Sequence, residues 1–249
     1  MKLAETTGLI TKEVKYGDSS RIITIITEDM GKVCAITNKY RRGKSGYMPG
    51  ISLFSYSRFV LFQNSEKSLY HINEADIIEP FKNIREDLMG IIYASYFGEV
   101  ANRVCVENES DTEFLRLLLN IFYALSKENA EFDKIKTVFE WKTAASEGYS
   151  PGLECCGKCK RNEVAYIDMQ RGFGLCGSCG ADFAGAAKLN DGVLRAIKYI
   201  CGADYPKMLS FDVSEKMLGY LNSLSEIYLQ MHLDYKFKTL DYLKKMKMS

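Results

Sequence analysis

The sequence predicts an α+β protein in which a β-rich domain comes first, helices follow, and a cysteine module interrupts the helical part. Three observations lead to this prediction. Residues 8–72 contain five short β-rich segments, apolar residues after Pro80 recur at helical spacing, and two C-x-x-C pairs lie within residues 153–182. We therefore expect a β domain at 1–80, a first helical part at 81–152, the cysteine module at 153–182 and a second helical part at 183–249.

The β domain is predicted from short runs of β-branched residues that are separated by turn-forming residues. Residues 8–14, 21–27 and 33–37 are expected to be strands, with turns at 16–20 and 28–32. Two further strands are expected at 51–63 and 68–72, around a turn at 64–67. Five short strands with connecting turns indicate a small barrel or a sandwich.

Helices are predicted where apolar residues repeat with the period of an α-helix. The first stretch runs from Leu88 to Val104, the second opens at Asp111, and the third runs from Phe132 to the helix-breaking residues 148–151. After the cysteine pairs, helical spacing returns at 190–201 and at 214–245.

The overall composition is that of an ordinary globular protein. The chain has 249 residues, of which 47% are hydrophobic and 26% charged. It contains no run of about 18 apolar residues, so we expect no membrane span and no membrane partner. The first residues lack the apolar core of a signal peptide, and the expected compartment is therefore the cytoplasm.

Four of the eight cysteines have the spacing of a metal site. Cys156 and Cys159 form one C-x-x-C pair, Cys176 and Cys179 form the other, and sixteen residues separate the pairs. Two such turns can bring four thiolates to one zinc ion, and four thiolates leave no open position for catalysis. We therefore expect one structural zinc ion. Cys155 is an alternative first ligand, although the C-x-x-C spacing favours Cys156.

Other interpretations of the cysteines carry less weight. A cytosolic protein keeps its thiols reduced, so disulfides are not expected. Ordinary buried thiols remain possible, whereas a redox dithiol would need only one C-x-x-C pair. Three cysteines lie outside residues 153–182. They are Cys34, Cys105 and Cys201, and we expect them to act as small core residues.

A basic segment stands out although the net charge of the chain is only +1. Between Met30 and Ser65 there is no Asp or Glu, and Lys39, Arg41, Arg42 and Lys44 lie close together between two predicted strands. Cations that no acidic neighbour neutralises suit a phosphate backbone, so these four residues are candidate DNA contacts. Nearby aromatic residues could stack on bases, but packing in the barrel core is the favoured interpretation for them; they are Tyr40, Tyr47, Phe54, Tyr56 and Phe59.

No motif for covalent chemistry is found in the sequence. The P-loop pattern, H-E-x-x-H and G-x-S-x-G are absent, and no pair of carboxylates stands out as an acid and a base. We therefore expect a protein that is not an enzyme.

The order of these parts resembles that of the RecO family. The opening at residues 5–12 and 16–24, the basic stretch Tyr40-Arg41-Arg42-Gly43-Lys44-Ser45, the approach to the cysteines at 148–153 and the closing stretch 233–243 are each similar to that family. Tyr40 departs from it, because a small residue usually precedes the two arginines. The resemblance covers nearly the whole chain and implies an OB-fold, a helical domain and a structural zinc knuckle.

The resemblance also implies a function in DNA repair and recombination. Such proteins bind single- and double-stranded DNA, anneal complementary strands, and act with RecR to load RecA onto strands coated by single-strand-binding protein. They also bind the acidic, apolar C-terminal tail of that coating protein. By this resemblance Arg41, Arg42 and Lys44 contact DNA, and the protein associates with the nucleoid.

Three rival functions stay open on the sequence alone. The first is an RNA-binding or ribosome-associated factor that is built from an OB-fold and a zinc ribbon. The second is an adaptor whose zinc module and helices bind proteins. The third, a zinc hydrolase, lacks any recognisable base or open coordination position.

Overall fold

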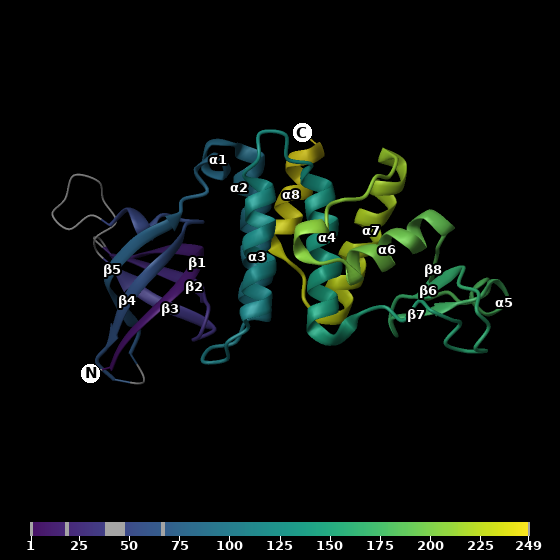
Figure 1. The fold of residues 1–249 in the computed structure, drawn as a ribbon, viewed down its shortest axis with the longest axis horizontal. Helices are drawn as coiled ribbons and strands as arrows, with labels where there is room; N and C mark the ends of the chain where they lie inside the picture. Colours follow the sequence, from purple (N-terminus) through teal and green to yellow (C-terminus); the bar gives the residue numbers. More distant parts are fainter. Residues whose placement is uncertain (1, 18–19, 38–47, 66–67, 249) are drawn as a thin grey trace. The chain divides into compact units, whose positions relative to one another are not determined.

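The protein is described by a computed structural model at residues 2–17, 20–37, 48–65 and 68–248. These residues divide into two compact units (Figure 1). The first unit comprises Met1–Ala130 and Phe237–Ser249, and the second comprises Glu131–Lys236. The chain thus leaves the first unit once and returns to it. The predicted α+β class is confirmed, whereas the division into four segments stays a prediction.

Five strands of the first unit form a closed barrel. They are β1 (Lys2–Tyr16), β2 (Ser20–Thr27), β3 (Lys32–Thr37), β4 (Tyr56–Gln63) and β5 (Tyr70–Glu79). Their order is β1-β2-β3-β5-β4, and β1 also pairs with β4, so that no strand is left at an open edge. All pairs are antiparallel except β3 with β5. This arrangement confirms the expected OB-fold.

The strand boundaries differ from the prediction at three places. The first strand is much longer than residues 8–14, because β1 pairs with β4 through residues 2–9 and with β2 through residues 8–16. The predicted strand 51–63 begins only at Tyr56, since a 3₁₀ turn (η1, Pro49–Ile51) precedes it and Phe54 has a positive φ of 67°. The fifth strand continues to Glu79 rather than ending at residue 72.

The barrel is filled by apolar side chains, most of them aliphatic, that alternate along its strands. Buried members of this core come from every strand and from η1; they are Ile10, Ile23, Ile25, Val33, Ala35, Ile51, Phe59, Leu61, Ile72 and Ala75. Phe54 is also buried, and its ring centroid lies 5.8 Å from that of Phe122. The predicted packing in the barrel core is therefore confirmed for Phe59, whereas Phe54 is buried against Phe122 of the helical part. Tyr56 is half-buried and donates a hydrogen bond to Thr7 Oγ1.

Four helices complete the first unit. They are α1 (Lys82–Glu86), α2 (Leu88–Val104), α3 (Thr112–Leu125) and α8 (Lys238–Met248). The predicted start at Asp111 is confirmed, since its carboxylate accepts a hydrogen bond from the N–H of Phe114. The carboxylate of Glu99 on α2 likewise accepts bonds from the N–H groups of Lys238 and Thr239 at the start of α8. This contact fixes the last helix to α2.

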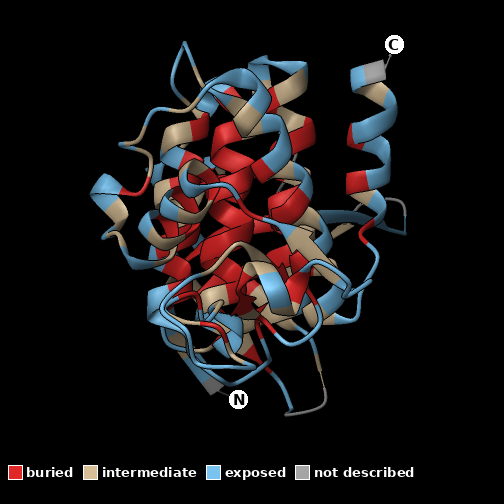
Figure 2. Ribbon diagram, turned by 90° about the vertical axis from the view of Figure 1, so that its right-hand side faces the viewer, coloured by how far each residue is buried: buried red, intermediate tan, exposed pale blue. Residues whose placement is uncertain are grey.

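The second unit is helical and carries the cysteine module. Its longer helices are α4 (Phe132–Ala144), α6 (Asp191–Gly202) and α7 (Glu215–Leu233), and a π turn (η2, Ala145–Tyr149) and a 3₁₀ turn (η3, Tyr205–Lys207) lie between them. Figure 2 shows buried residues along the inner faces of the helices. The helical stretch expected at 214–245 is divided into two helices, because Asp234 adopts a left-handed conformation with φ 46° and ends α7. In the part of the chain that the structure describes, no helix combines the length and apolar character needed to cross a membrane.

A buried network of charged residues joins α4 to α7. Lys136 and Glu140 form an ion pair of 2.8 Å, and their side chains are 3% and 0% exposed. Ser225 on α7 donates a 2.6 Å hydrogen bond to Glu140. Lys136 also donates to Asn222 at 2.7 Å and pairs with Glu226 at 3.3 Å. Each charge is therefore compensated by a partner, which a buried ion requires.

We expect Glu140→Ala to destabilise the second unit by about 3–5 kcal/mol, because the buried Lys136 cation loses its main partner. Trp141, the single tryptophan of the chain, lies fully buried on the same helix and reports unfolding by its fluorescence. The measurement is urea denaturation followed at this tryptophan.

The matched control is Glu154→Ala, which removes a carboxylate from the exposed pair with Lys198 in the same unit. An exposed pair contributes at most about 1 kcal/mol. Equal effects of the two variants would show that the buried network does not hold α4 to α7.

Candidate metal centre and nucleic-acid surface

The cysteine module is a three-stranded sheet with two cysteine turns. Strands β6 (Tyr166–Asp168), β7 (Phe173–Leu175) and β8 (Ala186–Lys188) are arranged in the order β7-β6-β8. Strands β6 and β7 form a hairpin between the two cysteine pairs, and β8 pairs with the other edge of β6. A short helix, α5 (Gly177–Gly180), begins directly after Cys176. The second cysteine pair therefore follows the hairpin, with Cys176 at the N-cap of α5 and Cys179 within it.

Local packing shapes the first cysteine turn. The N–H of Gly157 donates to the carbonyl of Gly174 at 2.8 Å, and this bond holds the turn against β7. A Cβ at Gly157 would lie 2.4 Å from the ring of Phe173, so only glycine fits there without displacing the ring. The N–H of Cys159 in turn points at the Sγ of Cys156 at 3.5 Å.

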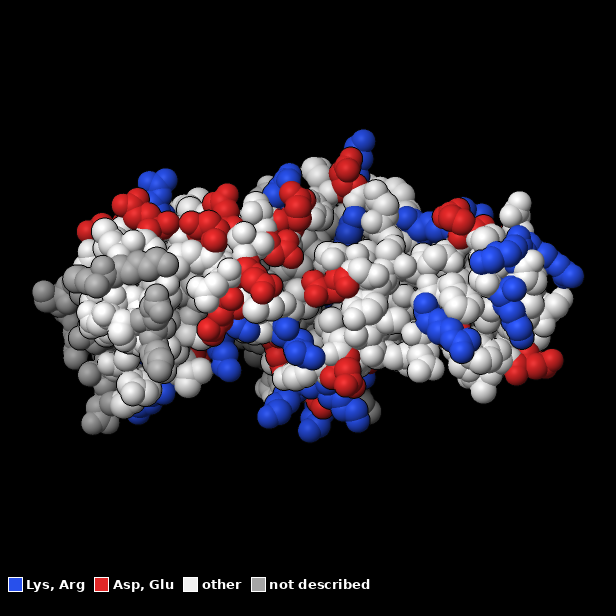
Figure 3. Space-filling view, turned by 90° about the horizontal axis from the view of Figure 1, so that it is seen from below, with Lys and Arg blue, Asp and Glu red and all other residues white. Residues whose placement is uncertain are grey.

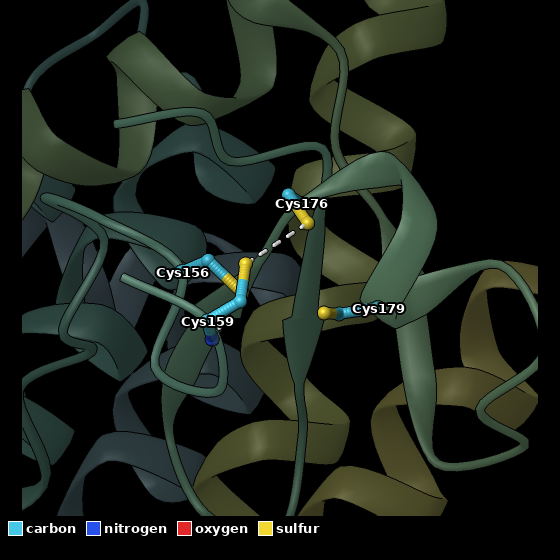
Figure 4. Close-up of side chains that lie close together, drawn as sticks. All are labelled: Cys156, Cys159, Cys176 and Cys179. Atoms are coloured by element: carbon cyan, nitrogen blue, oxygen red, sulfur yellow. Dashed lines mark hydrogen bonds between the residues drawn. The ribbon is translucent and has the colours of Figure 1, made fainter. Parts of the chain in front are cut away.

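The two turns bring four thiols together. The Sγ atoms of Cys156, Cys159, Cys176 and Cys179 all lie within 4.8 Å of one another, and those of Cys159 and Cys176 are 3.6 Å apart (Figure 4). Cys156 and Cys176 are fully buried, whereas Cys159 is exposed. Four thiol ligands at this separation can hold one metal ion. The neighbouring Cys155 is half-buried and does not belong to this group.

The thiols differ in how readily they lose a proton. Hydrogen bonding from the backbone N–H of Cys159 lowers the pKa of Cys156 to about 6. In contrast, the side-chain hydrogen bond with Cys176, followed by burial, raises the pKa of Cys179 to about 12. Backbone N–H donors thus favour the thiolate form of Cys156, whereas the neighbouring sulfur atoms disfavour loss of the proton from Cys179. A bound cation would remove this conflict, because thiolates bind metals and thiols do not.

The module is attached to α7 by aromatic residues. The ring of His232 lies 4.1 Å from that of Tyr228 and 4.8 Å from that of Tyr149. His232 Nε2 donates to the carbonyl of Met169 at 3.1 Å, just before the turn of the β6–β7 hairpin, if Nε2 carries the proton. A Cβ at Gly172 in this turn would lie 2.4 Å from the hydroxyl of Tyr228. Because these contacts span about sixty residues of sequence, no local pattern could have predicted them.

The remaining cysteines are partly as expected. Cys105 is buried in the first unit, which confirms its role as a small core residue. Cys34 and Cys201 are only half-buried. Burial raises the pKa of the Cys201 thiol to about 12, so this thiol stays protonated at neutral pH.

The candidate DNA contacts cannot be placed. Lys39, Arg41, Arg42 and Lys44 lie outside the described residues, and so do Tyr40 and Tyr47. The elements on either side of these residues are described: β3 ends at Thr37, and η1 begins at Pro49. The basic segment therefore connects two elements of the closed barrel, and its role in DNA binding stays a prediction.

Comparison with known proteins covers both parts of the chain. The family model described as Recombination protein O N terminal matches residues 1–81, and that described as Recombination protein O C terminal matches residues 85–241. The DNA repair protein RecO of Acetivibrio thermocellus is 35% identical over 247 residues, which is 98% of this chain and 97% of the relative. Those of Alkaliphilus metalliredigens and a Thermoanaerobacter species are 30% and 28% identical, and each alignment covers 98% of this chain and at least 98% of the relative.

We expect the second unit to lose stability as the pH falls below about 6.5, because of His232. Burial lowers the pKa of His232 below its usual value of about 6.5. The unfolded chain therefore binds a proton at a pH where the folded chain does not, and protonation favours unfolding. The contribution of neutral His232 is present above about pH 6.5 and is lost as the pH falls towards its folded pKa.

The measurement is urea denaturation, followed at Trp141, between about pH 5 and about pH 8 for the natural protein and for His232→Gln. Carboxylates contribute equally to both proteins, so the difference between them isolates the histidine. Parallel pH profiles of the two proteins would rule out this role of His232.

Proposed function

Because this chain belongs to the RecO family of DNA repair proteins, we propose that it is a recombination mediator that anneals complementary strands. In this proposal it binds single- and double-stranded DNA and acts with RecR to load RecA onto strands coated by single-strand-binding protein. It also binds the C-terminal tail of that coating protein. The observation that carries the proposal is the match of both family models, which together span nearly the whole chain.

The physical basis of annealing is charge neutralisation. Two DNA strands repel each other, and a cationic surface lowers this repulsion while the base edges remain free to pair. The closed barrel provides a rigid support, and the segment with Lys39, Arg41, Arg42 and Lys44 provides the cations. Contacts with phosphates carry no sequence information, so binding should be largely independent of sequence.

Zinc is the metal that fits the four thiols best. A zinc–sulfur distance of about 2.3 Å puts neighbouring sulfur atoms of a tetrahedron about 3.8 Å apart. The 3.6 Å between Cys159 and Cys176 is close to that value. When bound, zinc would link the two cysteine turns through Cys156, Cys159, Cys176 and Cys179. With four protein ligands the site would have a structural role, and we propose that the protein has no catalytic activity.

A second candidate function is RNA binding, because an OB-fold with a zinc module suits both nucleic acids. Competition between single-stranded DNA and RNA of equal sequence separates the two functions. The DNA repair relatives favour DNA.

We expect the protein to accelerate annealing of two complementary fluorescent oligonucleotides coated with single-strand-binding protein, and we expect the acceleration to fade with salt. Arg41→Ala with Arg42→Ala should weaken DNA binding and lower the slope of log affinity against log salt by about two, one for each lost phosphate contact. The measurement is the annealing rate and the DNA affinity across a salt series.

The matched control is Lys216→Ala with Lys236→Ala, which removes two exposed cations outside the basic segment. Its annealing rate should equal that of the natural protein. If the arginine variant retains full affinity at low salt, the basic segment is not the DNA contact. If the natural protein itself fails to anneal, the mediator function is wrong.

We expect Cys176→Ser to reduce bound zinc from one ion per chain to none and to unfold the module, since zinc binding and folding of small zinc modules are coupled. Cys155→Ser is the control and should retain the ion, because Cys155 lies outside the thiol group. Zinc content is measured by metal analysis of the purified protein. Loss of zinc in Cys155→Ser would show that Cys155, rather than Cys156, is the first zinc ligand.

A further inference from the structure

A small pocket opens on the cysteine module beside the thiol group. Its volume is about 160 Å³, and it differs from the metal centre, because only one of the four thiols borders it. Two cations, two aromatic rings and one buried carboxylate contribute to its wall; the lining residues are Lys158, Asp168, Arg171, Phe173, Leu175, Cys179 and Phe183. Neither the metal site nor the basic segment of the barrel accounts for this pocket.

Two cations line the pocket, and two more lie close to Lys158 in the sequence. Lys158 and Arg171 are exposed at its wall, and the exposed Lys160 and Arg161 follow Lys158 closely in sequence. Among the described residues, Lys158, Lys160 and Arg161 have no ion-pair partner. Figure 3 shows Lys and Arg side chains gathered over the right-hand end of the view, where the module lies.

The carboxylate in the pocket wall, that of Asp168, is held by hydrogen bonds within the β6–β7 hairpin. Asp168 is 1% exposed, and its Oδ1 accepts hydrogen bonds from the N–H groups of Gln170 and Arg171 at 3.1 and 3.0 Å. Arg171 lies 3.8 Å from its other oxygen, so one of the two wall cations is partly compensated. Four thiolates with a divalent ion would add a formal charge of −2. The charge of the pocket therefore does not by itself decide which ligand binds there, and the aromatic residues must contribute to recognition.

The aromatic residues provide a stacking surface. Phe173 is half-buried beneath the first cysteine turn, while Phe183 is 40% exposed. An exposed ring next to exposed cations suits single-stranded nucleic acid, since bases stack on the ring and phosphates pair with the cations. A single carboxylate ligand would use one cation and leave the ring unoccupied.

We propose that this face of the cysteine module is a second contact for single-stranded nucleic acid, with one base on Phe183 and adjoining phosphates at Lys158 and Arg171. The inference rests on the proposed function and deepens it. The basic segment belongs to the first unit and the module to the second. In this proposal each of the two units carries one contact for nucleic acid.

The test uses the full chain with its zinc content verified, and oligothymidylate as the probe. Phe183→Trp places a reporter in the pocket, and the only natural tryptophan, Trp141, is fully buried. Stacking of a base should quench the added fluorescence in a saturable manner. In this background, Lys158→Ala with Arg171→Ala should lower the salt slope of the quench by up to about two.

Two further variants test the site without disturbing the fold. Phe183→Ala should slow annealing and weaken binding of the oligonucleotide in the Arg41→Ala, Arg42→Ala background by about tenfold, the effect of one lost stacking contact. Asp182 is exposed and precedes Phe183. In the Phe183→Trp protein, Asp182→Asn should therefore raise the affinity for oligothymidylate, measured by the quench, a few-fold, because it removes a charge that repels phosphates. Lys216→Ala with Lys236→Ala is the matched control and should leave the quench unchanged.

The outcomes separate this inference from the proposed function. If the protein anneals strands but shows neither quenching nor an effect of the Phe183 and Asp182 variants, the module contact is wrong and the mediator function stands. If an acidic peptide quenches the reporter and oligothymidylate does not, the face binds protein, and the inference is overturned as well. Failure of the natural protein to bind or anneal DNA would instead remove the proposed function.

Discussion

The first unit depends on strand β1 having a different partner in each half. Its first half pairs with β4 and its second half with β2, and this change of partner closes the barrel. Gly8 lies at the changeover, where a Cβ would come within 2.6 Å of Ile25. Helix α2 approaches the same strand so closely that a Cβ at Gly98 would lie 2.8 Å from the carbonyl of Thr11. Barrel closure therefore requires glycine within β1, and helix packing requires glycine on α2 where it meets the same strand.

The second unit obeys a different constraint, because its module is too small to be stabilised by apolar burial alone. The buried cluster of the module contains Cys156, Leu175 and Cys176, with partly buried neighbours around it. Two of these three residues are themselves thiols of the candidate metal centre. Burial and metal binding thus use the same side chains, and the contact of His232 with Met169 ties the resulting module to α7. Small domains commonly depend on such cross-links.

Features that are local in sequence were predictable, and features that join distant residues were not. The spacing of the cysteines predicted that four thiols would meet, and Asp111 marked the start of α3. The length of β1 could not be predicted, because its first half is set by pairing with β4, more than forty residues away. The break at Asp234 was missed because the flanking residues continue the helical pattern. The charge of the basic segment is visible in the sequence, but its conformation lies outside the described residues.

The return of the chain to the first unit has a consequence for protein synthesis. Helix α8 packs on α2 through Phe237, Leu240 and Leu243, each at most 1% exposed, and Glu99 holds its first turn. The ribosome synthesises α8 only after the whole second unit. The barrel and its first helices can therefore fold early, as the N-terminal parts of growing chains do, but α2 waits with an uncovered apolar face until translation has passed residue 243. During that interval the nascent chain exposes an apolar surface that is buried in the folded protein.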